Sequence, residues 1–363
     1  MRPIVRALTA NKLNILLLVA PVSWVAEITA PDTFWVFILA AVSLVPLAGI
    51  IGLGTEELAR RAGPGIGGFL NATFGNAAEL IIAIVALHGG HVELVKASIT
   101  GSIVGNLLLV LGASFFLGGL GRKAQKFHRT AATNASTMLF LAVVALVMPA
   151  VFDLALYGSL QAEPAALKSL SICTAIVLMV AYVGSLIYSF ASQKDLFRPT
   201  HEDSGEPGLT TTQAVALLAI GTVLTTVQAE MLVSALEPAL GEFGFTEMFV
   251  GVILVAIVGN AAEHYSAILA ARRDHMSLAV EISVGSSAQI ALFVGPAVVL
   301  YSYIIGRPMS LLFNAFEITA IALSVLATSI VVVDGESNWV EGLQLLSVYL
   351  ILALAFYFVP PSG

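Results

Sequence analysis

The chain has 363 residues, of which 58% are hydrophobic and only 11% charged, and its formal net charge is −7. Because ordinary soluble domains carry roughly 25% charged residues, this composition excludes a typical soluble enzyme and a basic nucleic-acid-binding protein. The single cysteine, Cys173, excludes a disulfide framework and a cysteine metal site. We therefore predict an all-α polytopic membrane protein.

Apolar runs of roughly 17 to 25 residues are long enough to cross the hydrocarbon core of a bilayer. The first run follows three basic residues but lacks a convincing cleavage site, so we expect a retained helix and not a signal peptide. Eleven runs predict eleven transmembrane helices, at residues 13–28, 33–54, 68–87, 95–118, 132–152, 168–191, 211–236, 247–270, 278–302, 310–332 and 339–359.

The distribution of basic residues tests this count, because cytoplasmic loops of membrane proteins are enriched in Lys and Arg. With a cytoplasmic N-terminus, 13 of the 16 basic residues fall in or before cytoplasmic connections. Only Lys96, Lys168 and Arg307 fall on the other side. The same alternation places the C-terminus outside.

The eleven helices divide into an N-terminal helix and two sets of five. We expect an N-terminal tail and helix at 1–32, a first five-helix repeat at 33–192, an acidic cytoplasmic linker at 193–210 and a second repeat at 211–363. Because five is odd, the second repeat is inserted upside down relative to the first. Inverted repeats of this kind are typical of secondary transporters, whose ion sites lie near the membrane midplane.

A five-residue motif supports the duplication. The sequence GNAAE occurs at Gly75 to Glu79 and again at Gly259 to Glu263, each time inside an apolar run. A carboxylate at bilayer depth is costly, so two in matching contexts indicate one functional site built twice. The spacing of Asn76 and Glu79, and of Asn260 and Glu263, directs amide and carboxylate to one helix face. The glycine before each asparagine permits a helix break that frees carbonyl ligands.

A second polar segment follows one helix later in each copy, at Gly101 to Asn106 and at Gly285 to Gln289. A weaker correspondence joins Glu56 and Glu57 to Glu230. Two carboxylates with amide, hydroxyl and backbone oxygens form an all-oxygen site, which a hard cation such as calcium prefers.

The segments Gly68 to Leu80 and Gly251 to His264 resemble the two signature segments of the calcium/proton exchanger family, within the cation/calcium antiporter superfamily. The resemblance implies that Glu79 and Glu263 bind calcium and protons in turn, and that Glu56 or Glu57 and Glu230 line the access path. It also implies supporting ligands at Asn76, Asn260, Ser102, Ser286 and Gln289. Calcium is then the transported substrate, and no cofactor is expected. The short N-terminus favours a bacterial plasma-membrane protein over fungal and plant vacuolar relatives.

Several alternatives stay open on the sequence alone. His264 either takes part in proton coupling or packs as a satisfied core histidine, and the carboxylates near helix ends are alternatively exposed at the membrane interface. A sodium/calcium exchanger of the same superfamily is the alternative function, although that family would predict an aspartate in the repeated helices. An intramembrane enzyme lacks a catalytic motif here, and a channel does not fit an internal repeat. The expected partners are calcium ions, protons and the lipid bilayer, with self-association left open.

Overall fold

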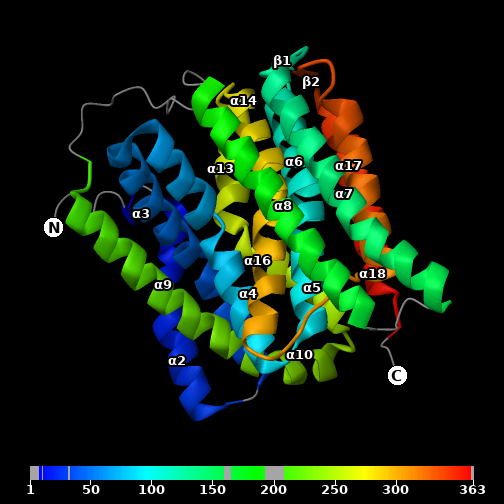
Figure 1. Cartoon of the computed structure of the whole chain (residues 1–363). Helices are drawn as coiled ribbons and strands as arrows, with labels where there is room; N and C mark the ends of the chain where they lie inside the picture. Colours follow the sequence, from blue (N-terminus) through cyan, green and yellow to red (C-terminus); the bar gives the residue numbers. More distant parts are fainter. Residues whose placement is uncertain (1–7, 10, 32, 159–164, 193–207, 361–363) are drawn as a thin grey trace. The chain divides into compact units, whose positions relative to one another are not determined.

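The computed structural model describes residues 8–9, 11–31, 33–158, 165–192 and 208–360, so most of the predicted acidic linker lies outside the described residues (Figure 1). The chain forms two compact units. Unit 1 comprises Met1–Gly89 and Ala181–Phe243, and unit 2 comprises Gly90–Val180 and Gly244–Gly363. Each unit therefore combines segments of both predicted repeats.

Unit 1 is built on the pairing of two long helices, α3 and α9, which lie side by side (Figure 1). Glycines allow the close approach: a Cβ atom on Gly54 would lie 3.0 Å from the Ala214 carbonyl oxygen, and one on Gly221 would lie 3.0 Å from Ile51. Small residues have this role at many membrane helix interfaces. The elements are η1 (Lys12–Leu18), α2 (Val19–Thr29), α3 (Phe34–Phe74), α4 (Ala77–Gly89), α9 (Thr211–Ser234), α10 (Leu236–Phe243) and the end of α8 (Ala165–Ser192).

Helix α3 is longer than the sequence predicted. The expected span 33–54 and the first residues of the span 68–87 form one continuous helix of 41 residues. The charged stretch between them stays helical because it is rich in helix formers and because Glu57 and Arg60 form an ion pair of 2.6 Å across one turn. The Arg61 guanidinium also donates a hydrogen bond to the Leu209 carbonyl.

Unit 2 surrounds a helix, α5, that is buried along most of its length. Four π-helical segments interrupt the helices described in this unit, at η2, η3, η4 and η5. The elements of the first part are α5 (Val92–Val104), η2 (Gly105–Val110), α6 (Leu111–Gly119), β1 (Gln125–Lys126), α7 (Arg129–Tyr157) and most of α8. Those of the second part are α11 (Glu247–Phe249), η3 (Val250–Val255), α12 (Ala256–Gly259), α13 (Ala261–Arg272), α14 (Met276–Val280), η4 (Glu281–Gly285), α15 (Ser286–Gln289), η5 (Ile290–Val294), α16 (Gly295–Ile304), α17 (Ala315–Val331), β2 (Glu336–Ser337) and α18 (Trp339–Tyr357).

Short connections contact one another at both ends of unit 2. Beyond the end of α6, β1 pairs with β2 in antiparallel register, with Gln125 opposite Ser337. The Gln125 amide also donates to the Ala271 carbonyl at 3.0 Å. The helices α5, η2 and α6 follow one another directly, and the start of α5 is the end of this span opposite to β1. There, His91 Nδ1 lies 2.9 Å from Glu247 Oε1. Connections that the sequence assigns to one side of the membrane thus contact one another within this unit.

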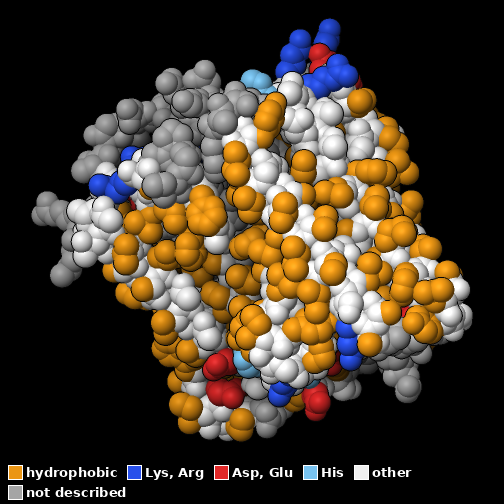
Figure 2. Space-filling view, in the orientation of Figure 1, with side chains coloured by type: hydrophobic (Ala, Val, Ile, Leu, Met, Phe, Trp, Pro, Cys, Tyr) orange, Lys and Arg blue, Asp and Glu red, His pale blue; other side chains and the backbone are white. Residues whose placement is uncertain are grey.

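The described residues contain eight helices that are long and apolar enough to cross a membrane, or nine if one bent pair counts as a span. Two shorter apolar helices, Ala77–Gly89 and Ala315–Val331, add to these. Breaks at the asparagines of the repeated motif shorten two of the predicted spans, so the count of eleven stays a prediction. Large hydrophobic side chains such as Phe140, Val180 and Ile187 are exposed on α7 and α8. Figure 2 shows hydrophobic side chains spread over the middle of the face in view, with charged side chains towards its upper and lower edges. Such a surface suits contact with lipid.

Candidate ion-binding site

The helix that carries the second copy of the motif breaks at Asn260. Helix α12 ends at Gly259 and α13 begins at Ala261, with Asn260 at a φ of −96° and a ψ of 5° between them. The Asn260 carbonyl then accepts the first hydrogen bond of α13, from the His264 N–H at 2.9 Å. The break expected from the sequence is therefore present, and it places Glu263 in the first turn of α13.

The Asn260 side chain joins two residues of the neighbouring helix. Its Nδ2 donates to Ser102 Oγ at 2.9 Å and to the Ala256 carbonyl at 2.9 Å, while its Oδ1 accepts a hydrogen bond from Asn106 Nδ2 at 3.3 Å. Asn260, Ser102 and Asn106 are all buried. Because a buried amide is costly unless it is hydrogen-bonded, these bonds fix the amide's orientation.

The Glu263 carboxylate is held by the helix that follows. Ser286 Oγ donates to Glu263 Oε2 at 2.6 Å, a short bond of the kind that a hydroxyl makes to a charged acceptor. Ser286 is buried at the start of α15, and Glu263 is half-buried. The structure thus brings two predicted ligands, Glu263 and Ser286, into direct contact, and their binding of a cation stays a prediction.

The first copy of the motif shows the same local pattern in unit 1. Helix α3 ends at Phe74 and α4 begins at Ala77, and the Asn76 carbonyl accepts the Leu80 N–H at 3.1 Å. Asn76 is fully buried, and Glu79 is half-buried in the first turn of α4. The sequence repeat is therefore also a repeat of helix breaks, each followed within one turn by a carboxylate.

The available donor atoms decide which cations the site suits. No group of three or more His, Cys, Asp or Glu side chains that could hold a metal occurs among the described residues. The polar groups around Asn260 and Glu263 are a carboxylate, hydroxyls, side-chain amides and a backbone carbonyl. Calcium accepts six to eight such oxygen ligands in flexible geometry, whereas zinc prefers nitrogen and sulfur.

The remaining predicted residues lie in several environments. Gln289 ends α15 and is half-buried between two π-helical segments, and the His264 side chain is half-buried beside Glu263. Glu56 and Glu230 are exposed, and the Glu57 carboxylate pairs with Arg60. These last three positions fit either an access path or simple interfacial exposure.

Sequence reasoning missed several polar groups. The sequence places Asn106 in the second polar segment and not in the site, but in the structure it donates a hydrogen bond to Asn260. The distribution of basic residues places Lys96 on the outer side of the membrane, but in the structure Lys96 lies within α5 and is 6% exposed. Glu317 and Asp153 are also buried. The Asn-x-x-Glu capping-box pattern at Asn314 to Glu317 was a usable signal for the helix start.

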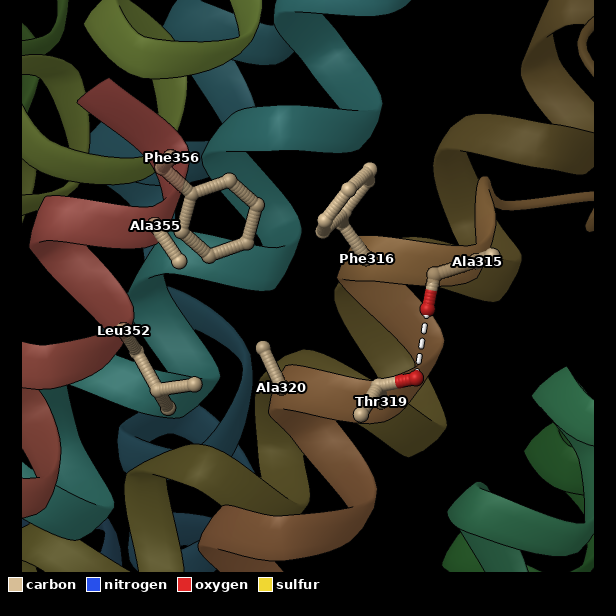
Figure 3. Close-up of a pocket in the computed structure, with 7 residues that line it drawn as sticks. All are labelled: Ala315, Phe316, Thr319, Ala320, Leu352, Ala355 and Phe356. Carbon is tan, nitrogen blue, oxygen red and sulfur yellow. Dashed lines mark hydrogen bonds between the residues drawn. The ribbon is translucent and has the colours of Figure 1, made fainter. Parts of the chain in front are cut away.

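A pocket elsewhere in unit 2 has a different character. It has a volume of about 300 Å³ and lies between α17 and α18 (Figure 3). Phe316 and Phe356 flank it, and its one hydroxyl, on Thr319, bonds to the Ala315 carbonyl of its own helix at 2.6 Å. Without an ionisable lining residue, this pocket suits hydrocarbon and not a cation.

The Ser286 hydrogen bond gives a first testable prediction. In Ser286→Ala, Glu263 loses a donor that orients its carboxylate, and a hydrogen bond to a charged group contributes about 1.5 to 3 kcal/mol. We expect the KM for calcium to rise about tenfold or more in reconstituted vesicles. Ser283→Ala is the matched control, because Ser283 is buried but bonds to the Ala279 carbonyl of its own helix at 2.9 Å. Equal KM values for the two variants would contradict this reading of the site.

The sequence is similar to a known family and to named proteins over most of its length. The sequence model of the family described as "Sodium/calcium exchanger protein" matches residues 33–191 and again 213–358. A "Ca(2+)/H(+) antiporter" of Synechocystis sp. is 43% identical over 97% of this chain and 99% of its own length. The "Ca(2+)/H(+) antiporter ChaA" of Bacillus subtilis is 39% identical over 96% of this chain and 99% of its own.

Solved structures of calcium/proton exchangers are also similar to this chain. The structure of native YfkE is similar to this chain, with a TM-score of 0.83 at 38% identity, and the match covers 96% of this chain and all of that one. The "H+/Ca2+ Exchanger CAX" shares the fold, with a TM-score of 0.68 at 16% identity, over 95% of this chain and 91% of its own. The chain therefore belongs to the sodium/calcium exchanger protein family, on the calcium/proton antiporter branch that these relatives represent.

Proposed function

We propose that this protein exchanges calcium for protons across a membrane as a secondary antiporter. The observation that carries the proposal is the repeated helix break with a carboxylate in the next turn, at Asn76 with Glu79 and at Asn260 with Glu263. The names of relatives at 43% and 39% identity support the choice of ions. The protein is thus a transporter and not an enzyme, and calcium is its substrate.

In this proposal Glu79 and Glu263 supply the two negative charges that balance one calcium ion. Neutral oxygens are supplied or oriented by five polar residues, Asn76, Asn260, Ser102, Ser286 and Gln289. Asn106 belongs to the same group of residues because it donates a hydrogen bond to Asn260. His264 takes part in proton coupling beside Glu263, and Glu56, Glu57 and Glu230 lie along the access path. The chemistry of the donor set supports calcium over softer metals.

Exchange follows from competition for the same oxygens. A carboxylate that binds calcium must be deprotonated, so calcium and protons exclude each other at Glu79 and Glu263. Two buried carboxylates without a compensating positive charge are costly, so the site holds either calcium or protons when its access switches from one side of the membrane to the other. A one-unit pH difference changes the free energy of each transferred proton by about 1.36 kcal/mol, which drives calcium movement.

The experiment measures calcium flux in reconstituted vesicles with imposed gradients. We expect an outward-directed proton gradient to drive calcium uptake, and an equal sodium gradient at fixed pH to drive none. Calcium affinity of the purified protein should fall steadily as the pH is lowered from about 8 to 5.5. Sodium-driven uptake would favour the sodium/calcium exchanger instead, and an affinity that stays constant with pH would rule out a shared site.

We also infer one N-terminal helix followed by two inverted five-helix repeats, eleven spans in total. The two separate matches to the family model, at 33–191 and 213–358, support this division. The N-terminus is then cytoplasmic, in a bacterial plasma membrane. The contacts between β1 and β2 and between His91 and Glu247 support the alternation of sides, because each joins connections assigned to one side.

Cysteine labelling tests this orientation. Lys123 and Glu93 are both exposed and fall on opposite sides in the eleven-span scheme. In a Cys173→Ala background, a membrane-impermeant reagent added to intact cells should label Glu93→Cys but not Lys123→Cys until the membrane is opened. Labelling of both variants in intact cells would overturn the scheme.

A further inference from the structure

Helix α5 carries Ser102 and continues directly into η2, which carries Asn106, and these two residues hold Asn260. Two buried ionisable residues, Lys96 of α5 and Glu317 of α17, lie at another face of α5. Lys96 is 6% exposed and Glu317 is 1% exposed. Burying such charges costs several kcal/mol each unless they are paired and hydrogen-bonded. Neither residue contacts the groups assigned above to calcium or protons, so their retention in the interior calls for another role.

Both residues connect α5 to the segment that leads into α17. Lys96 Nζ donates to the Leu312 carbonyl at 2.8 Å. Thr100 Oγ1 donates to Glu317 Oε1 at 3.3 Å. The second carboxylate oxygen, Oε2, accepts the Asn314 N–H at 3.0 Å, which completes the cap of α17. The carboxylate of Glu317 is therefore bound at both oxygens, and α5 is tied to a capped helix start.

The spacing on α5 places these contacts on a different face from the candidate ion site. Lys96 and Thr100 are four residues apart and share one face. Ser102 lies about 200° around the helix from Thr100, at about 100° per residue, and its hydroxyl accepts from Asn260. A rotation of α5 that relaxed the Thr100 bond would therefore displace Ser102 from Asn260.

We propose that Glu317, acting through Thr100, is a positioning residue for the ion site. With Lys96 it sets the rotation and depth of α5, and so holds Ser102 and Asn106 against Asn260. It does not itself contact the ion. This inference rests on the proposed calcium exchange and adds a requirement for a residue outside both repeated motifs.

The test uses full-length protein in reconstituted vesicles, with flux measured per folded transporter. Thr100→Val keeps the side-chain shape and removes the hydroxyl, whereas Thr100→Ser keeps the hydroxyl. We expect Thr100→Val to raise the KM for calcium about three- to tenfold with the maximal rate within about twofold, and Thr100→Ser to restore the KM. Thr319→Val on α17 is the matched control, because its hydroxyl is exposed and bonds within its own helix.

A double variant tests the coupling, since residues that act through one contact are not additive. Glu317→Gln combined with Thr100→Val should raise the KM no further than the more affected single variant. Three results would each overturn the inference while leaving the proposed function standing. They are a KM of the double variant that equals the product of the two single effects, an unchanged KM in Thr100→Val, and a KM in Thr100→Ser that stays as high as in Thr100→Val. Absence of calcium flux and binding in the wild type would instead overturn the proposed function, and this inference with it.

Discussion

Glu263→Gln is expected to abolish calcium/proton exchange. The substitution keeps the size of the side chain and removes one of the two charges proposed to balance calcium. Removing one partner of a buried ion pair typically costs about 3 to 5 kcal/mol, which lowers calcium affinity more than about hundredfold. Glutamine also cannot take up and release a proton, so the coupled reaction fails as well. Glu79→Gln should have the same effect, because its helix repeats the break and the carboxylate position.

The measurement is calcium uptake driven by a pH gradient, normalised to the amount of monodisperse protein. Glu336→Gln is the matched control, because Glu336 is exposed in β2 and its contact with Lys126 spans 3.5 Å at the surface. An exposed pair of this kind contributes little, so its flux should match the wild type. Near-normal flux in either Glu263→Gln or Glu79→Gln would show that the site is assigned wrongly.

Gly101→Ala is expected to have the next largest effect, although it adds only a methyl group. A Cβ atom at this position would overlap the carbonyl oxygen of Val252 in η3 and lie 2.5 Å from its Cα. These are backbone atoms, so no side chain can move aside. Gly251 approaches α5 from the other side, where a Cβ would lie 2.5 Å from that of Ala97. The two helices would have to separate, and Ser102 would leave Asn260.

Overpacking of a well-packed interior typically costs about 1 to 3 kcal/mol, and a backbone overlap belongs at the upper end of that range. We expect Gly101→Ala to lower the thermal midpoint and to reduce exchange at least tenfold. Gly105→Ala is the control four residues later, because a Cβ there meets nothing within 4 Å. It should retain wild-type stability and exchange. Equal losses in both variants would mean that helix packing at Gly101 is not the cause.

Much of the site could be predicted because its chemistry is local in sequence. The breaks at Asn76 and Asn260 follow from a repeated motif, and the proximity of Ser286 to Glu263 follows from two segments one helix apart. The extent of α3 could not be predicted in the same way. Its charged middle looks like a loop by hydropathy, and the helix formers within it, the pairing of Glu57 with Arg60 and the packing of α3 against α9 together keep it helical.

The buried charges could not be predicted for a different reason. Lys96 stands near the start of an apolar run, where a lysine ordinarily extends to the membrane surface. Its burial depends on the Leu312 carbonyl, 216 residues away in the chain. Glu317 likewise needs Thr100, 217 residues away. Contacts between such distant segments leave no periodic signal, so hydropathy and spacing cannot reveal them.

The π-helical segment η2 also constrains how this sequence can change in length. It begins at Gly105, so it contains Asn106, and α6 follows it directly. Downstream, Gly112 of α6 packs against Gly342 of α18. Each residue added to or lost from a helix turns everything beyond it by about 100°, and a π turn accommodates one extra residue. A single-codon deletion within η2 would therefore convert the π turn into an α turn and leave Gly112 facing α18, whereas a deletion in a regular helical stretch would turn it away by about 100°. The segment η2 is thus the place where this helix can lose a residue without losing its contact with α18.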